Sequence, residues 1–155
     1  MTTRVNPIPD GYKSAMPYLS VAGAAAAIAF YKEAFGAEET LRLEEPSGKV
    51  AHAEMRIGTA SFSLADEYPE MNIRGPKSIG GTGVIIQVYV EDVDALFKRA
   101  EAAGATVKRA PTDEFYGDRS GTLEDPFGHV WMFQSHKEDV SPEEMKRRFA
   151  AFFTK

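Results

Sequence analysis

His52 and Glu54 are the side chains of this sequence best suited to proton transfer. They lie two residues apart in a segment, 49–57, whose alternation predicts a strand, so both share one face with Cα atoms about 6.5–7 Å apart. A neighbouring carboxylate orients an imidazole ring and favours its protonated form, so the pair could act as general acid and base. A solvated sheet face with a Glu54–Arg56 ion pair is the alternative, and the sequence leaves both interpretations open.

The segment 49–57 separates apolar and polar residues onto two faces. We expect the apolar face to lie under a helix. The polar face then meets solvent or forms a wall of a binding cavity, because pockets combine a few placed polar groups with apolar surface. Arg56 is therefore a candidate ligand-binding residue. The apolar face is predicted to hold Ala51, Ala53, Met55 and Ile57, and the polar face Val50, His52, Glu54 and Arg56.

A second alternating segment, 84–90, adds two candidates. Gln87 and Tyr89 share a face that is apolar yet able to form hydrogen bonds, which suits a binding surface. The opposite face contains only valine and isoleucine and is predicted to lie on the helix side. Its members are Val84, Ile86, Val88 and Val90.

The segment 129–135 is predicted to be the last strand. Trp131 is a typical core residue and is assigned to the helix side. Alternation then places Met132 and Gln134 on the open face, where both are candidate ligand-binding residues.

A turn at 115–121 combines two aromatic residues, an acid, a base and two glycines. Glycine allows other groups to approach the backbone closely. Tyr116, Asp118 and Arg119 are therefore candidates for the mouth of a cavity. The alternative is structural: Asp118 and Arg119 could lock the turn by local pairing.

The elements that must position these residues follow a repeated order. Strand–helix–strand–strand–strand occurs twice, about 70 residues apart, so the predicted fold is α+β, with two tandem βαβββ modules forming a cupped mixed sheet. A four-stranded sheet under one helix leaves a face open, so two modules or two chains must close it. The predicted strands are 15–21, 38–44, 49–57, 59–65, 84–90, 106–109, 119–124 and 129–135, and the helices are 24–35 and one running from the N-cap Asp92 to Gly104.

The repeat divides the chain into four segments. A capping box at Ser141, followed by Pro142, predicts a further helix whose apolar stripe includes Met145, Phe149, Phe152 and Phe153. That helix packs on its own domain or contributes to a dimer contact. We expect a first module at 13–66, a connector at 67–83, a second module at 84–137 and a C-terminal helix segment at 138–155.

Composition argues against several classes of function. The net charge is −5 with no basic cluster, which disfavours nucleic-acid binding. The absence of cysteine excludes disulfides, thiolate metal sites and a cysteine nucleophile. No apolar run approaches the ~18 residues of a membrane span, and the polar segment 1–13 lacks a signal core. We therefore expect a cytoplasmic protein without membrane or nucleic-acid partners.

Several short motifs together resemble the vicinal oxygen chelate superfamily of glyoxalases, bleomycin-resistance proteins and extradiol dioxygenases, and more closely its PhnB-like branch. The resemblance covers roughly residues 13–140 and is specific for the fold rather than for an activity. The motifs are PYLSV at 17–21, AFYKEAFGA at 29–37, HAE at 52–54, VYVEDVD at 88–94, YGDR at 116–119 and DPFGHVW at 125–131.

The resemblance also implies where metal ligands would stand. Enzymes of the superfamily place one ligand on the first and one on the last strand of each module, which corresponds here to Met16, Phe62, Ile85 and Met132, with the register at Phe62 open to a shift by one residue. Hydrocarbon and thioether groups suit none of the hard divalent ions. We therefore expect no metal and no cofactor.

Two functions follow as expectations. The first is a homodimer that binds a small, apolar or aromatic molecule in a metal-free cavity, as in the bleomycin-resistance proteins that the chain resembles, with sequestration as one outcome. The second is a lyase- or isomerase-type or other enzyme of the superfamily that uses His52 and Glu54 as catalytic residues.

Overall fold

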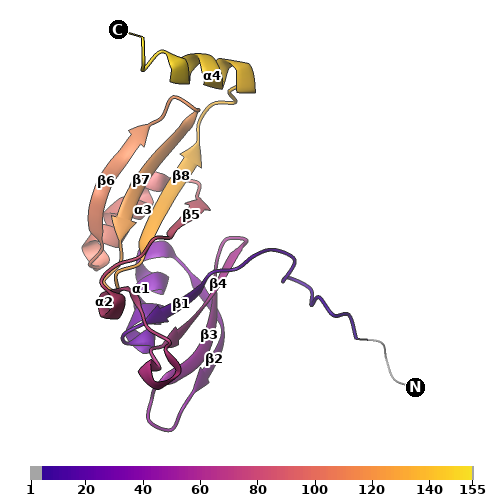
Figure 1. Ribbon diagram of the computed structural model, residues 1–155, viewed down its shortest axis with the longest axis vertical. Helices are drawn as coiled ribbons and strands as arrows, with labels where there is room; N and C mark the ends of the chain where they lie inside the picture. Colours follow the sequence, from indigo (N-terminus) through magenta and orange to yellow (C-terminus); the bar gives the residue numbers. More distant parts are fainter. Residues whose placement is uncertain (1–4, 155) are drawn as a thin grey trace.

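The computed structural model describes residues 5–154 (Figure 1). The start of the polar N-terminal segment and the last residue of the C-terminal segment, residues 1–4 and 155, lie outside the described residues. The expected α+β fold of two βαβββ modules with a C-terminal helix is confirmed. Where independent units begin and end stays a prediction.

The first module follows the predicted pattern closely. Helix α1 ends where Gly36 adopts a left-handed conformation and its N–H binds the carbonyl of Tyr31, as expected of a glycine C-cap. The elements are β1 (Tyr18–Val21), α1 (Ala24–Phe35), β2 (Glu38–Glu44), β3 (Val50–Ile57) and β4 (Ala60–Asp66), and the connector adds a 3-10 turn, η1 (Pro69–Met71), and a short helix, α2 (Pro76–Ile79).

The second module repeats the order. Asp92 caps α3 by accepting the N–H of Ala95, as the sequence predicts. Strand β6 continues four residues beyond its expected end at residue 109 despite Pro111, because β6 is an edge strand and an edge tolerates a missing N–H. The elements are β5 (Ile85–Tyr89), α3 (Val93–Ala103), β6 (Thr106–Asp113), β7 (Asp118–Glu124) and β8 (Val130–His136), followed by α4 (Pro142–Ala150).

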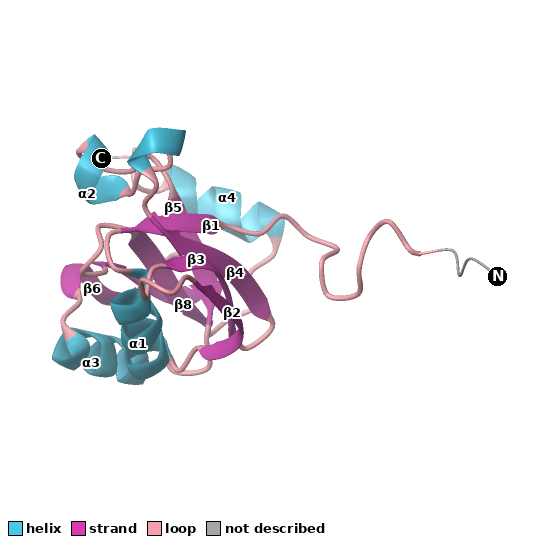
Figure 2. Cartoon of the chain, turned by 90° about the horizontal axis from the view of Figure 1, so that it is seen from below, coloured by secondary structure: helices cyan, strands magenta, loops and turns pink. Residues whose placement is uncertain are grey.

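The strands form two four-stranded sheets, each hydrogen-bonded within its own module. Their orders are β1-β4-β3-β2 and β5-β8-β7-β6, and in each sheet the first pair is parallel and the others antiparallel. Helices α1 and α3 lie side by side and cover the sheets from one side (Figure 2). Helix α4 lies beyond the end of the second sheet (Figure 1). No helix in the described part of the chain is long and apolar enough to cross a membrane.

One aromatic core joins the two modules. The ring centroid of Phe35 on α1 lies 5.0 Å from that of Trp131 and 4.7 Å from that of Phe133, both on β8. Trp131 and Phe133 are fully buried, which confirms the predicted side of Trp131. Burying a side chain of this size stabilises the fold by about 1.5–3 kcal/mol, so the modules hold each other through shared apolar area.

A buried carboxylate reinforces this junction. Asp125, in the turn between β7 and β8, accepts the hydroxyl of Tyr31 at 2.6 Å and the indole N–H of Trp131 at 3.0 Å through Oδ2. Its Oδ1 accepts the backbone N–H groups of Phe127 and His129. Burial, followed by the charge of Asp125 and this hydrogen bond, raises the pKa of Tyr31 well above its usual value.

Two face assignments were wrong. Ala51 is exposed and Val50 is fully buried, the reverse of the simple alternation, because the pairing of β2 with β3 shifts register between Leu43 and Glu44. Val84 is 65% exposed rather than under a helix, because it precedes the first paired residue of β5, whereas Val88 is buried as predicted.

We predict that Asp125→Ala lowers the free energy of unfolding by about 3 kcal/mol or more, because it leaves the buried Tyr31 hydroxyl and Trp131 indole N–H without a hydrogen-bond acceptor. Tyr31→Phe should cost about 1–2 kcal/mol, since Asp125 keeps its other partners. Urea unfolding measures both. The control is Asp10→Ala, which removes an exposed carboxylate, and an Asp125→Ala cost no larger than the control's would contradict the central role of this carboxylate.

Candidate functional site

A hydrogen-bonded chain of four side chains lies on the outer face of the first sheet, away from the helices. Tyr18 on β1 contacts Nδ1 of His52 through its hydroxyl at 2.7 Å, and Nε2 of His52 lies 3.3 Å from Oε1 of Glu54. The hydroxyl of Tyr12 donates to Oε2 of Glu54 at 2.6 Å. The structure therefore brings His52 and Glu54 together as the strand register predicts, and both side chains remain partly accessible.

Glu54 carries the negative charge of this hydrogen-bonded group of side chains. The hydrogen bonds from Tyr12 and then His52 lower the pKa of Glu54. The same bond raises the pKa of Tyr12, and burial with the charge of Glu54 raises that of Tyr18. The arrangement keeps a carboxylate ionised while two phenols stay protonated, which suits hydrogen bonding to a polar ligand.

Arg56 does not take part in this hydrogen-bonded chain of side chains. Its guanidinium pairs with Glu38 across β2 and β3 at 2.5 Å, and Glu54 contacts Tyr12 and His52 instead of Arg56. The Glu54–Arg56 ion pair considered from the sequence is therefore not formed.

A second hydrogen-bonded chain lies on the outer face of the second sheet. Asp118, only 5% exposed, accepts the hydroxyl of Tyr89 at 2.6 Å and contacts Nδ1 of His136 at 2.7 Å. Nε2 of His136 lies 2.8 Å from Asp139. Tyr89, Tyr116 and Asp118 line a cavity of 360 Å³ together with residues leading into α4. Three sequence-predicted residues thus meet here.

The charges of this second chain are distributed differently. The carboxylates of Asp139 and then Asp118 raise the pKa of His136, which favours the imidazolium form. The hydrogen bond to Asp118 raises the pKa of Tyr89 to about 12. Gly117 supports the geometry: at φ +96° its carbonyl accepts the N–H groups of Lys137 and Glu138, both at 2.9 Å, which fixes the chain after β8.

Arg119 points to a different set of partners. It makes a two-nitrogen contact with Asp94 at 2.7 and 2.8 Å and a further one with Asp113 at 3.1 Å. It thus ties β7 to α3 and β6 rather than lining the cavity with Tyr116. Asp118 contacts Tyr89 and His136 instead, so the local Asp118–Arg119 pairing considered for the turn is not formed.

Gln134 lies on β8, an inner strand of the second sheet. It pairs in register with Tyr89 and Ser120 and is 1% exposed, yet its amide nitrogen has no hydrogen-bond partner among the described residues. A buried donor without a partner is costly, about 1–3 kcal/mol, unless a ligand or water satisfies it. Met132, on the same face, is partly buried.

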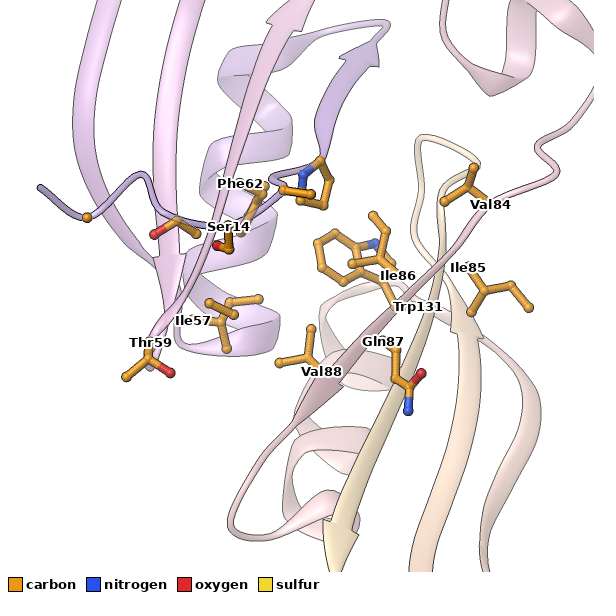
Figure 3. Close-up of a pocket in the computed structure, with 15 residues that line it drawn as sticks. Ser14, Ile57, Thr59, Phe62, Val84, Ile85, Ile86, Gln87, Val88 and Trp131 are labelled. Carbon is orange, nitrogen blue, oxygen red and sulfur yellow. The ribbon is translucent and has the colours of Figure 1, made fainter. Parts of the chain in front are cut away.

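Gln87 faces a third space, a cavity of 370 Å³ between the modules (Figure 3). The cavity is lined mainly by apolar side chains from both modules, among them Ile57, Ile86 and Val88. The sequence-predicted residues are therefore distributed over two sheet faces and one junction.

The four positions implied for metal ligands do not fit a divalent ion. Phe62 lies in the core, 5.4 Å from Trp131 between ring centroids, so the outward position of β4 is Ser63, which pairs with Tyr18 and Glu54. This corrects the register by one residue. The side chains at Met16, Ser63, Ile85 and Met132 offer no carboxylate or imidazole, which such ions prefer. No group of three or more His, Asp or Glu residues within 5–154 is placed to hold a metal.

Sequence reasoning missed Tyr12, Tyr18, His136 and Asp139 as members of these chains. Tyr18 stands in a predicted strand and could have been found from its alternation. Tyr12 gives no local signal, because it reaches Glu54 across 42 residues of sequence.

The comparisons with known proteins agree on one fold. Residues 14–133 match the family model described as the Glyoxalase/Bleomycin resistance protein/Dioxygenase superfamily. A protein of Mycobacterium bovis, Mb0911c, is 44% identical over 133 residues, which cover 84% of this chain and 88% of the relative. TioX from Micromonospora sp. ML1 is 25% identical with a TM-score of 0.63, covering 83% of this chain and 100% of TioX. The PhnB protein from Bacillus cereus is 19% identical with a TM-score of 0.62, covering 79% and 99%.

We predict that Tyr12→Phe raises the pKa of Glu54 toward its ordinary value of 4.5, because the largest cause of its lowering is removed. A lowered carboxyl pKa stabilises the fold above the unfolded-state value, and that contribution is lost as pH falls through the folded value. The stability lost in Tyr12→Phe should therefore be visible at neutral pH and shrink in acid. Carbon NMR titration of the glutamate carboxyls measures the shift; Tyr68→Phe is the control, and an unmoved Glu54 would refute the contact.

We also predict that Asp139→Asn lowers the pKa of His136 toward 6.5, since Asp139 is the largest cause of its raised value. A raised histidine pKa stabilises the fold below the unfolded-state value and stops doing so as pH rises through the folded value. Proton NMR of the imidazole measures the midpoint. Asp10→Asn serves as the exposed control, and equal midpoints in both variants and the parent would disprove the Asp139 contact.

Proposed function

This chain belongs to the glyoxalase/bleomycin resistance protein/dioxygenase superfamily, and from that premise we propose that it is a PhnB-like protein that binds a small apolar or aromatic molecule in a metal-free cavity. The observation that carries the proposal is the pair of open outer sheet faces. Each face combines exposed aromatic surface with a hydrogen-bonded chain of a histidine, a carboxylate and a phenol.

The open faces also support a homodimer. Tyr18 is 57% exposed and Tyr89 is 58% exposed, and a four-stranded sheet covered by one layer of helices needs a cover on its other face. Because the helices of both modules share one side, the two outer faces of a chain do not face each other across its core. We propose that the first module of one protomer faces the second module of its partner and that two cavities result.

The chemistry of the faces favours binding a neutral, partly aromatic ligand and withholding it from solution. The phenols of Tyr18 and Tyr89 are exposed and offer flat apolar surface with a polar edge. The donor set at the metal positions supports a site that works without a metal. We propose a cytoplasmic location, in keeping with a chain that contains no cysteine.

An acid–base enzyme is the second candidate function. The Tyr18–His52–Glu54 chain favours it, because an imidazole held between a phenol and a carboxylate is a common arrangement for moving a proton. In that case a substrate would replace Tyr18 or Tyr12 as a hydrogen-bond partner, and His52 or Glu54 would exchange a proton with it.

We predict that the purified protein sediments as a dimer and binds at least one planar aromatic antibiotic from a panel at micromolar concentration or below. Sedimentation equilibrium and isothermal calorimetry measure the two properties. Tyr89→Ala should weaken binding by about tenfold, the effect of losing one stacking or edge contact of about 1.4 kcal/mol. A monomer that binds no member of the panel would count against the proposal.

Metal analysis and His52→Ala separate the two candidate functions. A stoichiometric divalent ion that is lost in His52→Ala would overturn the metal-free proposal. Recovery of the ligand chemically intact after incubation with the parent protein would support binding over catalysis, whereas conversion that is lost in His52→Ala would support catalysis.

A further inference from the structure

The connector forms a small roof over the outer face of the first sheet. Tyr68 and Ile73 close a β-bridge through two backbone hydrogen bonds of 2.9 and 3.0 Å, and the residues between them turn through η1, with Asn72 at φ +59°. This bridge projects Tyr68, Met71 and Ile73 above the strands. The result is a cavity of 580 Å³, within the range of about 300–1,000 Å³ typical of ligand pockets.

The floor of this cavity depends on the register shift in β3. Because Ala51 is turned outward, its methyl group lies in the cavity, and Ala65 on β4 lies beside it. Two alanines at the floor leave room that larger side chains would fill. Tyr18 completes the wall and also contacts His52, so the cavity adjoins the first hydrogen-bonded chain.

Two charged side chains, Glu45 and Lys49, lie near the cavity. Glu45 accepts the hydroxyl of Tyr68 at 2.7 Å and that of Ser47 at 3.3 Å. The ammonium of Lys49 lies 3.8 Å from the centroid of the Tyr68 ring. Glu45 lines the cavity and its carboxylate repels an anion, whereas Lys49 is not among the lining residues; placing an unpaired charge on such a surface is costly. Two phenol rings and a thioether favour aromatic contacts instead.

We propose that this cavity is a binding subsite for a neutral aromatic group, which lies on Tyr18 beneath the connector. The inference rests on the proposed small-molecule function and extends it, because it assigns the apolar part of the ligand to a place and a chemical class. The connector is thus a part of the binding site, and the polar end of the ligand is directed toward His52.

The test compares two probes on the full-length protein. N-phenylnaphthylamine is neutral, and anilinonaphthalenesulfonate carries a sulfonate on a closely similar skeleton; both fluoresce in apolar surroundings. The neutral probe should bind at least roughly tenfold more tightly. Its binding should shift the backbone NMR signals of Ala51, Ala65 and Met71. Equal affinity for the two probes would overturn the assignment to neutral ligands.

Ala51→Leu fills the cavity without entering the core, because Ala51 is exposed. It should weaken the neutral probe by at least roughly tenfold, whereas Ala110→Leu, the same change at an exposed position of β6, should alter it by less than about twofold. Met71→Ser, on the exposed connector, is a second variant and should weaken the probe by about threefold or more.

The outcomes separate this subsite from the general proposal. A probe that binds equally well to Ala51→Leu overturns the subsite and leaves small-molecule binding standing. A protein that binds the aromatic antibiotics but not the neutral probe also overturns it. Loss of the probe in Ala51→Leu, with retention in Ala110→Leu, supports it.

Discussion

The buried carboxylate of Asp125 and the aromatic core around it fix how the two modules sit. Asp125 belongs to the second module, but its strongest partner, the hydroxyl of Tyr31, comes from the first. Two peripheral contacts act in the same sense: Arg99 on α3 donates to the carbonyl of Ala34, and His129 contacts the carbonyl of Ser20. Because an ionised group is costly to bury unless its oxygens are satisfied, this junction tolerates little movement. The helices are thereby locked together on one side.

That arrangement determines where binding is possible. Because α1 and α3 lie on the same side of the sheets, the other face of each sheet is directed outward. The polar side chains of β3, β7 and β8 lie on these outward faces. The polar side chains on these faces form hydrogen bonds with one another through phenols and carboxylates. They can therefore be partly buried without a metal ion to bind them. The open faces are thus a consequence of the junction, and the cavities form where the connector and the segment before α4 fold over them.

The sequence predicts the elements well and the site only in part. Helix 24–35 and strand 38–44 were predicted with their observed bounds, because glycine caps and turns mark them. Alternation failed at Val50 and Ala51, since a register shift between paired strands leaves no trace in either strand alone. The position carried over from the family resemblance was off by one residue at Phe62, a shift that the sequence left open, and such a shift moves a side chain from the open face to the core. Tyr12 and Asp139 lie outside the repeat, so no periodicity points to them.

The hydrogen bonds within the first group of polar side chains bear on the choice between binding and catalysis. Both oxygens of Glu54 and both ring nitrogens of His52 already have partners within the chain. A general base needs a lone pair aimed at its substrate, so catalysis would require Tyr18 or Tyr12 to leave its position. Tyr12 lies on the exposed N-terminal segment and could leave at low cost, but its departure frees Glu54 rather than the imidazole. Tyr18 is held in a strand beside a cavity, where an aromatic ligand would stack on its ring and keep it in place. The geometry therefore favours a ligand that adds to the hydrogen-bonded chain over one that breaks it.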